Sequence, residues 1–419
     1  MKVAMLGHKA IPSTKGGIET VLTALCPLLA ERGAQVTCYN RSADCMDAAF
    51  LPQVVGNVYK GVRLKKAPTV KKRGIAAMVA SFTGAIACAF SRFDIVHFHA
   101  EGPCAAMFIP RLFGKKCVAT VHGIDWQREK WGKGFSSKYI RFGEKMLVRH
   151  ADAVIVLSEA ARTYFWETYG RETVLIPNGI RRPKRLPAAQ IKELYGLTKD
   201  GYFCLVSRLT AEKGVHTLIA AYKTLHTDKK LVICGETSDT DAYVAELHEL
   251  AKGDDRILFT GFVSGDLLGE IYSNAYAVCL PSTLEGMSLS LLEALAYGNA
   301  VICSDIPENT AVCGERALTF KAGDSAALAA KMQYLVGTPS VTMPYGGMAE
   351  LVEDGVTGTL SRSAAPADFA AAIEKTVADA DRLRDMRENC RKAAEKTATL
   401  QEYGDTLLKL YTTSGEKQT

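Results

Sequence analysis

Residues 202–218 read YFCLVSRLTAEKGVHTL, and the order of apolar and charged residues in them indicates the fold class. An apolar run short enough for a buried strand is followed by a turn that contains Arg208 and Lys213, and then by the start of an apolar helix. A strand, a turn and a helix in this order form the repeating unit of a parallel α/β sheet. The stretch therefore predicts a βα unit with two cations at the end of its strand.

The same pattern recurs along the chain. In the second half, the predicted strands are KLVICGE, RILFTGF, AYAVCLPS and NAVICSD (230–236, 256–262, 275–282 and 299–305). In the first half, they are KVAML, QVTCYN, DIVHFH, KCVATVHG and AVIVLS (2–6, 35–40, 94–99, 116–123 and 153–158), with an amphipathic helix over 18–32. The prolines, arginines and Asn-Gly turn of residues 176–187 separate the two series. We predict two βαβ domains with open parallel sheets, joined near residue 180.

Composition excludes few functions. The chain has 419 residues, 48% of them apolar, and a net charge of +6, which suits anionic small molecules, a membrane surface or nucleic acid equally. Its twelve cysteines form no CxxC motif, and the N-terminus has too short an apolar run for a signal peptide. We therefore expect a cytoplasmic protein.

Common cofactor motifs are missing. No GxGxxG follows the first strand and no GxxxxGK[ST] occurs, which disfavours a nicotinamide dehydrogenase and a P-loop NTPase. No DxD or His/Cys cluster offers a plausible divalent-metal site. We expect neither a metal nor a bound cofactor.

Candidate site residues follow the predicted strands, where open parallel sheets bind ligands. Arg208 and Lys213 suit a diphosphate, although a solvated charged loop has the same pattern. Gly16 and Gly17 would let the backbone approach a ligand, or form an ordinary turn. His122 would shape a substrate pocket or be structural. Asp125 would accept from a sugar hydroxyl or cap a turn.

Two glutamates frame a second candidate stretch, STLEGMSLSLLEALAYGNAVI (282–302). Glu285 and Glu293 lie eight positions apart, a helical rise of about 12 Å. That separation is too long for a glycosidase pair, whose carboxyl groups lie within roughly 10 Å. It fits a ligand with hydroxyls at both ends, such as a nucleotide sugar. A helix-capping acid and a solvated glutamate remain the simpler alternative.

Several motifs together resemble the family 4 (group 1) glycosyltransferases. Arg208 and Lys213 followed by EGMSLSLLEALAYGNAVICSD (285–305) are similar to the donor site of these enzymes. In the first half, GHKAIPSTKGGIET, DIVHFHAEGP, PRLFGKK, HGIDWQREKWGK and YGRETVLIPNGI resemble the bacterial rhamnosyltransferase-like subgroup that builds capsule and exopolysaccharide. The resemblance is dense over residues 1–335.

This resemblance implies the GT-B fold, an α/β architecture in which two Rossmann-like domains face each other across a cleft. Residues 1–180 would form the acceptor-side domain, residues 181–400 the donor domain, and residues 401–419 a C-terminal helix that packs back on the first domain. It implies a metal-independent hexosyltransferase that retains the anomeric configuration. A sugar, with rhamnose or another hexose as candidates, would pass from a nucleoside-diphosphate sugar to a saccharide or lipid-linked acceptor.

The resemblance also implies residue roles. Glu285 would contact the donor sugar, Glu293 would hold the ribose hydroxyls, and Arg208 and Lys213 would neutralise the leaving diphosphate. His122 would line the sugar pocket. The remaining donor-side positions are Gly16, Gly17, Gly286, Met287 and Ser288. On the acceptor side, the resemblance implies Asp125 and Glu19.

One segment departs from the family pattern. Residues 338–378 resemble a second copy of the βα unit that the family places once after the donor helix, and we expect a duplicated segment there. The tryptophan expected near the start of the last helix is absent, and Tyr403 stands in its place.

Two other functions remain open on sequence grounds: a nucleotide-sugar 2-epimerase, and a non-catalytic nucleotide-sugar-binding component of a polysaccharide assembly complex. No nucleic-acid partner is expected. Residues 74–90 are uncharged, too short and too rich in Ala and Gly for a membrane span, so we expect a core helix. The seven basic residues within 60–73 also suggest peripheral contact with an anionic membrane at its inner face.

Overall fold

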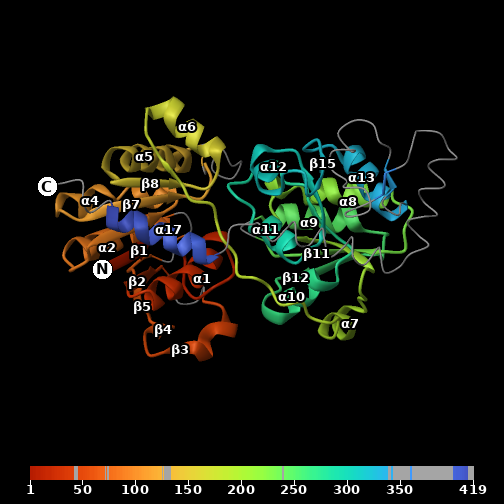
Figure 1. Cartoon of the computed structure of the whole chain (residues 1–419), viewed down its shortest axis with the longest axis horizontal. Helices are drawn as coiled ribbons and strands as arrows, with labels where there is room; N and C mark the ends of the chain where they lie inside the picture. The colour runs from red at the N-terminus through yellow and green to blue at the C-terminus, as the bar shows by residue number, and fades with distance from the viewer. Residues whose placement is uncertain are drawn as a thin grey trace. The chain divides into compact units, whose positions relative to one another are not determined.

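The computed structural model describes residues 1–41, 46–70, 72, 75–124, 126, 134–237, 240–337, 341–342, 359–360 and 400–413. Contacts between residues divide the chain into two compact units (Figure 1). Unit 1 comprises Met1–Arg181, Glu285–Leu289 and Ala398–Thr419, and unit 2 comprises Arg182–Leu284 and Ser290–Thr397.

Unit 1 contains a nine-stranded sheet in the order β3-β4-β5-β2-β1-β6-β7-β8-β9. The strands are β1 (Lys2–Leu6), β2 (Gln35–Asn40), β3 (Val54–Val55), β4 (Val58–Tyr59), β5 (Val62–Lys66), β6 (Ile95–His99), β7 (Lys116–Val121), β8 (Ala153–Val156) and β9 (Val174–Leu175). Strand β1 pairs in parallel with both β2 and β6. The β3–β4 and β4–β5 pairs are antiparallel, so one edge of the sheet departs from the fully parallel prediction.

Helices connect these strands. They are α1 (Gly17–Glu31), α2 (Ile75–Ala89), α3 (Glu101–Cys104), α4 (Phe108–Leu112), α5 (Phe135–His150) and α6 (Glu159–Tyr169), with a 3-10 turn η2 (Ala48–Gln53). The predicted core helix over 74–90 is α2, and only one of its faces is buried: Ile86 on the other face is exposed.

Unit 2 contains a six-stranded sheet in the order β12-β11-β10-β13-β14-β15, and every pair in it is parallel. The strands are β10 (Tyr202–Val206), β11 (Lys230–Cys234), β12 (Ile257–Gly261), β13 (Ala277–Leu280), β14 (Ala300–Ser304) and β15 (Leu318–Phe320). The helices are α7 (Gln190–Tyr195), α8 (Val215–Lys223), α9 (Asp241–Ala251), α10 (Gly265–Asn274), α11 (Leu289–Ala296), α12 (Pro307–Cys313) and α13 (Ser325–Gly337), with the 3-10 turn η5 (Ala211–Lys213) before α8.

Each sheet is buried on both faces because its strands alternate between two cores. In β1, Val3 and Met5 join one apolar cluster and Ala4 and Leu6 join the other. Side chains of a strand point alternately to opposite faces, so near-continuous apolar strands need helices on both sides. The predicted α/β class with two largely parallel sheets is confirmed.

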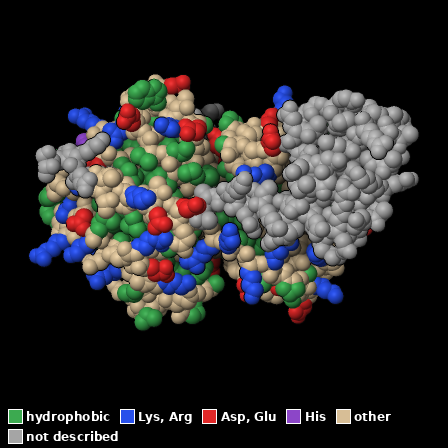
Figure 2. All heavy atoms as spheres, in the orientation of Figure 1, with side chains coloured by type: hydrophobic (Ala, Val, Ile, Leu, Met, Phe, Trp, Pro, Cys, Tyr) green, Lys and Arg blue, Asp and Glu red, His purple; other side chains and the backbone are tan. Residues whose placement is uncertain are grey.

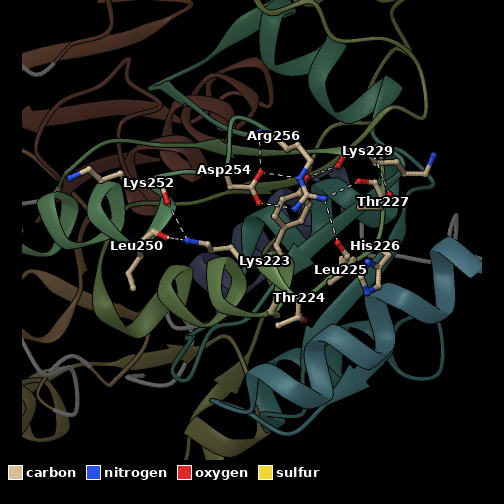
Figure 3. Close-up of polar contacts among 12 residues, drawn as sticks. Lys223, Thr224, Leu225, His226, Thr227, Lys229, Leu250, Lys252, Asp254 and Arg256 are labelled. Atoms are coloured by element: carbon tan, nitrogen blue, oxygen red, sulfur yellow. Dashed lines mark hydrogen bonds and ion pairs between the residues drawn. The ribbon is translucent and has the colours of Figure 1, made fainter.

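Hydrogen bonds donated by two cationic side chains, Arg256 and Lys223, hold the C-terminal end of α8 in unit 2 (Figure 3). Arg256 donates to both carboxylate oxygens of Asp254 and to the carbonyl oxygen of Thr227, at 2.7–2.9 Å. Its hydrogen bond to Asp254 is the main reason that the pKa of that carboxyl lies below its ordinary value. Lys223, in the last turn of α8, donates to the carbonyl oxygen of Leu250 at the end of α9. These contacts fix the helix whose other end carries the Lys213 turn.

The helix α17 (Leu400–Thr413) packs on α1 in unit 1 (Figure 1). Arg32 forms an ion pair with Asp405 at 2.6 Å, and Tyr403 is buried in the core around α1. Tyr411 bonds to His97 of β6 at 2.5 Å. The last described helix thus completes the core of the first unit.

The segment 338–378 is described only at β16 (Val341–Thr342) and β17 (Thr359–Leu360), which pair in parallel; the rest of the predicted duplicated segment lies outside the described residues. Within the described part of the chain, no helix is long and apolar enough to cross a membrane.

Candidate functional site

The cationic turn predicted from residues 207–214 lies at the carboxyl end of β10. Arg208 lies two residues after this strand, and Lys213 ends the 3-10 turn η5. Gly214 then opens α8 with φ +65°, a left-handed conformation that glycine adopts without strain. A Cβ at Gly214 would lie 2.1 Å from the carbonyl oxygen of Pro281, so the backbones approach too closely for any side chain.

The loop after β13 is fastened to this turn. Strand β13 pairs in parallel with β10, so both loops leave the sheet at the same edge. Thr283 donates its backbone N–H to the carbonyl oxygen of Glu212 at 2.8 Å. Ser290, in α11, donates its hydroxyl to the carbonyl oxygen of Val206 at 2.6 Å. Residues 206–212 and 283–290, which are far apart in sequence, are therefore joined by hydrogen bonds to backbone carbonyl oxygens.

The two glutamates are not separated by eight helical residues. Helix α11 begins at Leu289, so Glu285 precedes it by four residues, and residues 286–288 are not helical. The helical rise of about 12 Å assumed eight helical residues and is therefore wrong in its premise. The expected helix N-terminus does lie between Glu285 and Glu293 in sequence.

Glu293 lies in α11 and is partly buried. Tyr272 of α10 donates its hydroxyl to one Glu293 carboxylate oxygen at 3.1 Å, and its ring stacks on Tyr297. Burial raises the pKa of Glu293 to about 7, since this single hydrogen bond offsets only part of the cost of desolvating the charge. A carboxyl that titrates near neutrality would make the binding of any ligand that it holds sensitive to pH.

If Glu293 holds ribose hydroxyls, as the family resemblance implies, we predict that donor affinity falls roughly tenfold between about pH 8 and pH 6, because the protonated carboxyl loses much of its capacity to accept hydrogen bonds. Calorimetric titration with an intact nucleotide sugar measures this, since a free nucleoside diphosphate carries a terminal phosphate that titrates in the same range. Glu293→Gln should bind weakly with no pH dependence in this interval. An equal slope in wild type and Glu293→Gln would contradict the prediction.

In unit 1, Gly16 is the residue before α1 and Gly17 is its first residue. Glu19, in the first turn, is buried and accepts from the backbone N–H of Lys9 at 2.7 Å. It thereby ties the loop after β1 to α1. Its carboxylate has a structural partner, and its role toward an acceptor stays a prediction.

Four histidines gather at the carboxyl ends of β1, β6 and β7. The Nε2 atom of His122, after β7, lies 3.1 Å from Nδ1 of His99, and His99 stacks on His97. His8, after β1, lies 3.0 Å from the side-chain oxygen of Asn40. Among the described residues, His8 Nδ1 and His99 Nε2 have no hydrogen-bond partner although both atoms are buried. Of these four histidines, only His122 was predicted as a site residue from the sequence. The alternation of His97 and His99 within an apolar strand is the sequence feature that could have indicated the others.

Burial keeps three of these histidines, His8, His97 and His99, neutral. It lowers the pKa of His97 to about 3 and that of His8 to about 4, and it lowers the pKa of His99 well below its ordinary value. The unfolded chain binds protons at these sites from about pH 6.5 downward, whereas the folded chain does not.

We therefore predict that the free energy of unfolding of unit 1 falls as the pH drops from about 6.5 toward 4. Chemical denaturation followed by circular dichroism at successive pH values measures the loss. The exposed His226→Gln serves as the control and should leave the curve unchanged. A constant unfolding free energy between about pH 7 and 5 would rule the prediction out.

The segment Glu285–Leu289 makes its contacts within unit 1. A Cβ on Gly286 would lie 1.8 Å from the carbonyl oxygen of His122, and Met287 Sδ accepts from the backbone N–H of Asn178 at 3.1 Å. The predicted residues Gly286 and His122 are thus neighbours, and only glycine fits at the first position. Ser288 is buried.

Asp125 lies outside the described residues. Within the described ranges, no group of three or more His, Cys, Asp or Glu side chains is arranged to hold a metal ion.

Two family models match the chain. The model of Glycosyltransferase Family 4 matches residues 15–182, and the model of Glycosyl transferases group 1 matches residues 189–336 and 334–397. Between them, they cover most of both units.

Individual proteins that match the chain are distant in sequence, with identities of 30% or less in the examples below. The chain is 29% identical over 261 residues to a glycogen synthase of Mycobacterium tuberculosis, which is 59% of this chain and 61% of that protein. It therefore spans about three fifths of the length of this relative. An alpha-maltose-1-phosphate synthase of the same organism is 27% identical over 83% of this chain and 92% of its own length. The O-antigen chain mannosyltransferase RfbU of Salmonella typhimurium is 30% identical over 40% of this chain and 46% of its own length.

Solved structures share the fold. Sucrose-phosphate synthase from Thermosynechococcus elongatus superposes with a TM-score of 0.69 at 20% identity over 98% of both chains. Anabaena HepE, solved in complex with UDP-glucose, gives 0.64 at 19% identity over 99% of this chain and all of its own. The chain shares the GT-B fold with these solved structures.

Proposed function

The chain belongs to the group 1 glycosyltransferases, and from that membership we propose that it moves a hexose from a nucleoside-diphosphate sugar to a saccharide or lipid-linked acceptor, with retention of anomeric configuration and without a metal. We propose that the reaction serves surface polysaccharide synthesis.

The observation that carries this proposal is the junction of two loops at the carboxyl edge of the unit 2 sheet. The backbone bond from Thr283 to Glu212 and the close approach of Gly214 to Pro281 fix the Lys213 turn against the start of the Glu285 loop. Cations beside a loop that leads to a helix N-terminus suit a diphosphate, because both favour negative charge. Carboxylates on either side of that position suit the hydroxyls of a sugar and a ribose.

In this proposal, Glu285 accepts from donor-sugar hydroxyls, and Glu293 accepts from ribose hydroxyls. The backbone of Gly286, Met287 and Ser288 lies along the diphosphate. Arg208 and Lys213 neutralise the charge that develops on the leaving group.

The reaction forms one bond and breaks one bond at the anomeric carbon. The acceptor oxygen bonds to this carbon on the face from which the diphosphate oxygen departs, and the acceptor proton passes to that departing oxygen. No protein base is needed in such a step. His122 would line the sugar pocket, Gly16 and Gly17 would admit phosphate or acceptor close to the backbone, and Glu19 and Asp125 would lie on the acceptor side.

The sugar and the process rest on similarity. The first-half motifs resemble rhamnosyltransferase-like enzymes, so rhamnose or another hexose is proposed as the transferred group. The relative RfbU is named for its action on O-antigen chains, which favours a surface-polysaccharide acceptor. The HepE complex with UDP-glucose favours a nucleoside-diphosphate hexose as donor.

A two-stage experiment tests the proposal. Thermal shifts with UDP-glucose, GDP-mannose and dTDP-rhamnose identify the donor, and release of nucleoside diphosphate is then followed with alkyl glycosides as acceptors. We expect release that requires both substrates, and a product anomer equal to the donor anomer by NMR. Epimerised nucleotide sugar without an acceptor would identify a 2-epimerase. Donor binding without turnover on any acceptor would identify a non-catalytic binding protein.

Lys213→Ala is expected to lower kcat about 100-fold while the donor dissociation constant rises less than about tenfold, because charge on the leaving diphosphate peaks in the transition state. Pre-steady-state turnover and equilibrium titration separate the two quantities. Lys192→Ala, which removes an exposed cation from α7, is the matched control. Equal losses in both quantities would refute a transition-state role.

A further inference from the structure

The solvent-facing side of α2 is unusual for a helix on a protein surface. The helix contains no charged residue, and while Ala80, Gly84, Ala85 and Cys88 face the core, Ile75 and Ile86 are exposed on its other side. Phe90, directly after the helix, is 74% exposed. Surface helices normally present polar side chains to water, so an apolar outer face of this length indicates a partner surface.

Neighbouring residues extend this face. Helix α4 packs beside α2, and at its end Leu112 is 78% exposed. The ring of Phe113 meets that of Phe90 edge-on, with centroids 4.7 Å apart. We call the exposed apolar set Ile75, Ile86, Phe90, Leu112 and Phe113 the α2 face.

Cations surround the α2 face. Residues 48–116 contain eleven basic and two acidic residues, a net charge of +9 in a chain whose total is +6. One of the two acids, Glu101, is fully buried. The segment that leads from β5 runs along α2, since the Thr83 hydroxyl donates to the carbonyl oxygen of Pro68 at 2.7 Å. Figure 2 shows Lys and Arg side chains projecting from the edge of unit 1 where Figure 1 places α2 and α4.

Individual cations lie at both ends of the helix. Lys66 and Lys72 are exposed before it, and Arg92 is exposed after it. Lys65 and Lys115 act electrostatically on the Cys88 thiol of α2, which places both near the helix. Lys71 and Arg73 lie outside the described residues.

We propose that the α2 face docks on an anionic lipid bilayer, with α2 lying in the plane of the membrane, its apolar side chains among the lipid tails and the flanking cations on the head groups. An apolar side between cations is the composition of an in-plane membrane helix, and anionic lipids supply the complementary charge. The surrounding excess of positive charge favours a bilayer over a second copy of the same face, because two such faces would repel each other.

The full-length protein is tested by sedimentation with vesicles of phosphatidylcholine alone and of phosphatidylcholine mixed equally with phosphatidylglycerol. We expect binding to the anionic vesicles only, weakened by salt. The double variant Phe90→Asp/Leu112→Asp should bind at least about tenfold more weakly, and Arg92→Gln about fivefold more weakly. The matched control is Leu194→Asp, which places the same charge on an exposed leucine of α7 and should bind like wild type.

Thermal melting verifies folding, and if the double variant is unstable, Leu112→Asp alone serves. Equal binding by the α2-face variants and the Leu194→Asp control would overturn the proposal, as would failure of the wild type to bind anionic vesicles. Sedimentation equilibrium without lipid supplies a third criterion: a dimer that Phe90→Asp dissociates would assign the face to a second copy instead. Vesicle binding is measured without donor, so its outcome is independent of turnover.

Discussion

Glu285→Ala should abolish measurable sugar transfer, with kcat lowered about 1,000-fold, the largest effect expected of any single substitution. Glu285 lies in the loop between β13 and α11, which is held before it by the backbone hydrogen bond from Thr283 to Glu212 and after it by the hydrogen bond from the Ser290 hydroxyl to Val206. We expect the Glu285 carboxylate to stabilise the positive charge that develops on the sugar ring. Without the Glu285 side chain, the hydroxyls of the donor sugar lose a hydrogen-bond acceptor, and the positive charge of the transition state loses a compensating negative charge.

The measurement is release of nucleoside diphosphate in the presence of donor and acceptor, with donor affinity determined separately. Glu249→Ala is the control, since it removes an exposed carboxylate of α9 that pairs only with its neighbour Lys252 among the described residues. Glu285→Gln separates charge from hydrogen bonding, because the amide still accepts one hydrogen bond. Full activity in Glu285→Ala would remove this residue from the proposed site.

Gly214→Ala is expected to destabilise unit 2 by at least about 3 kcal/mol and to weaken donor binding as well. Two costs add at this position. The left-handed backbone strains any L-residue, and the new Cβ would lie 2.1 Å from the Pro281 carbonyl oxygen, which belongs to the backbone. Relief of this collision requires the Lys213 turn and the loop after β13 to separate.

Gly253→Ala provides a matched comparison within the same unit. Gly253 has φ +82°, and a Cβ there would meet nothing within 4 Å. This variant should therefore lose only about 1 kcal/mol, the cost of the backbone conformation. Urea denaturation gives the free energy of unfolding of both variants, and the difference between their losses is the cost of the collision with Pro281. A similar loss in the two variants would mean that the loops are not tightly joined.

The sequence predicted the strands of both sheets well, because each is an apolar run bounded by turn residues. Strand β2 coincides with the predicted run 35–40, and β10 begins at the predicted residue. Strands β3, β4, β5, β9 and β15 were missed. Residues 54–66 mix valines with charged and turn residues at the edge of one sheet, and β9 and β15 are edge strands of only two and three residues. Edge strands are half solvated and lack the continuous apolar signal.

The candidate site was predicted in part. The turn with Arg208 and Lys213 could be predicted because two charged residues stand between an apolar strand and an apolar helix. The joining of this turn to Thr283 depends on which strands are neighbours, and a strand order of β10 beside β13 cannot be read from local periodicity. The histidine cluster was missed for the same reason, because His8, His99 and His122 meet only when β1, β6 and β7 lie side by side.

The packing of α17 on α1 has a consequence for biosynthesis. Gly404 lies so close to Leu28 that a Cβ would approach that side chain to 2.8 Å, and the two helices share one core. A ribosome needs roughly 10–40 s to make the 218 residues that separate Arg181 from Leu400. During that interval, the surface of α1 that α17 covers is open to water and to chaperones. Unit 2 can fold before the final helix of unit 1 has been made. A chain that stops before Leu400 keeps the α17-binding surface of α1 exposed.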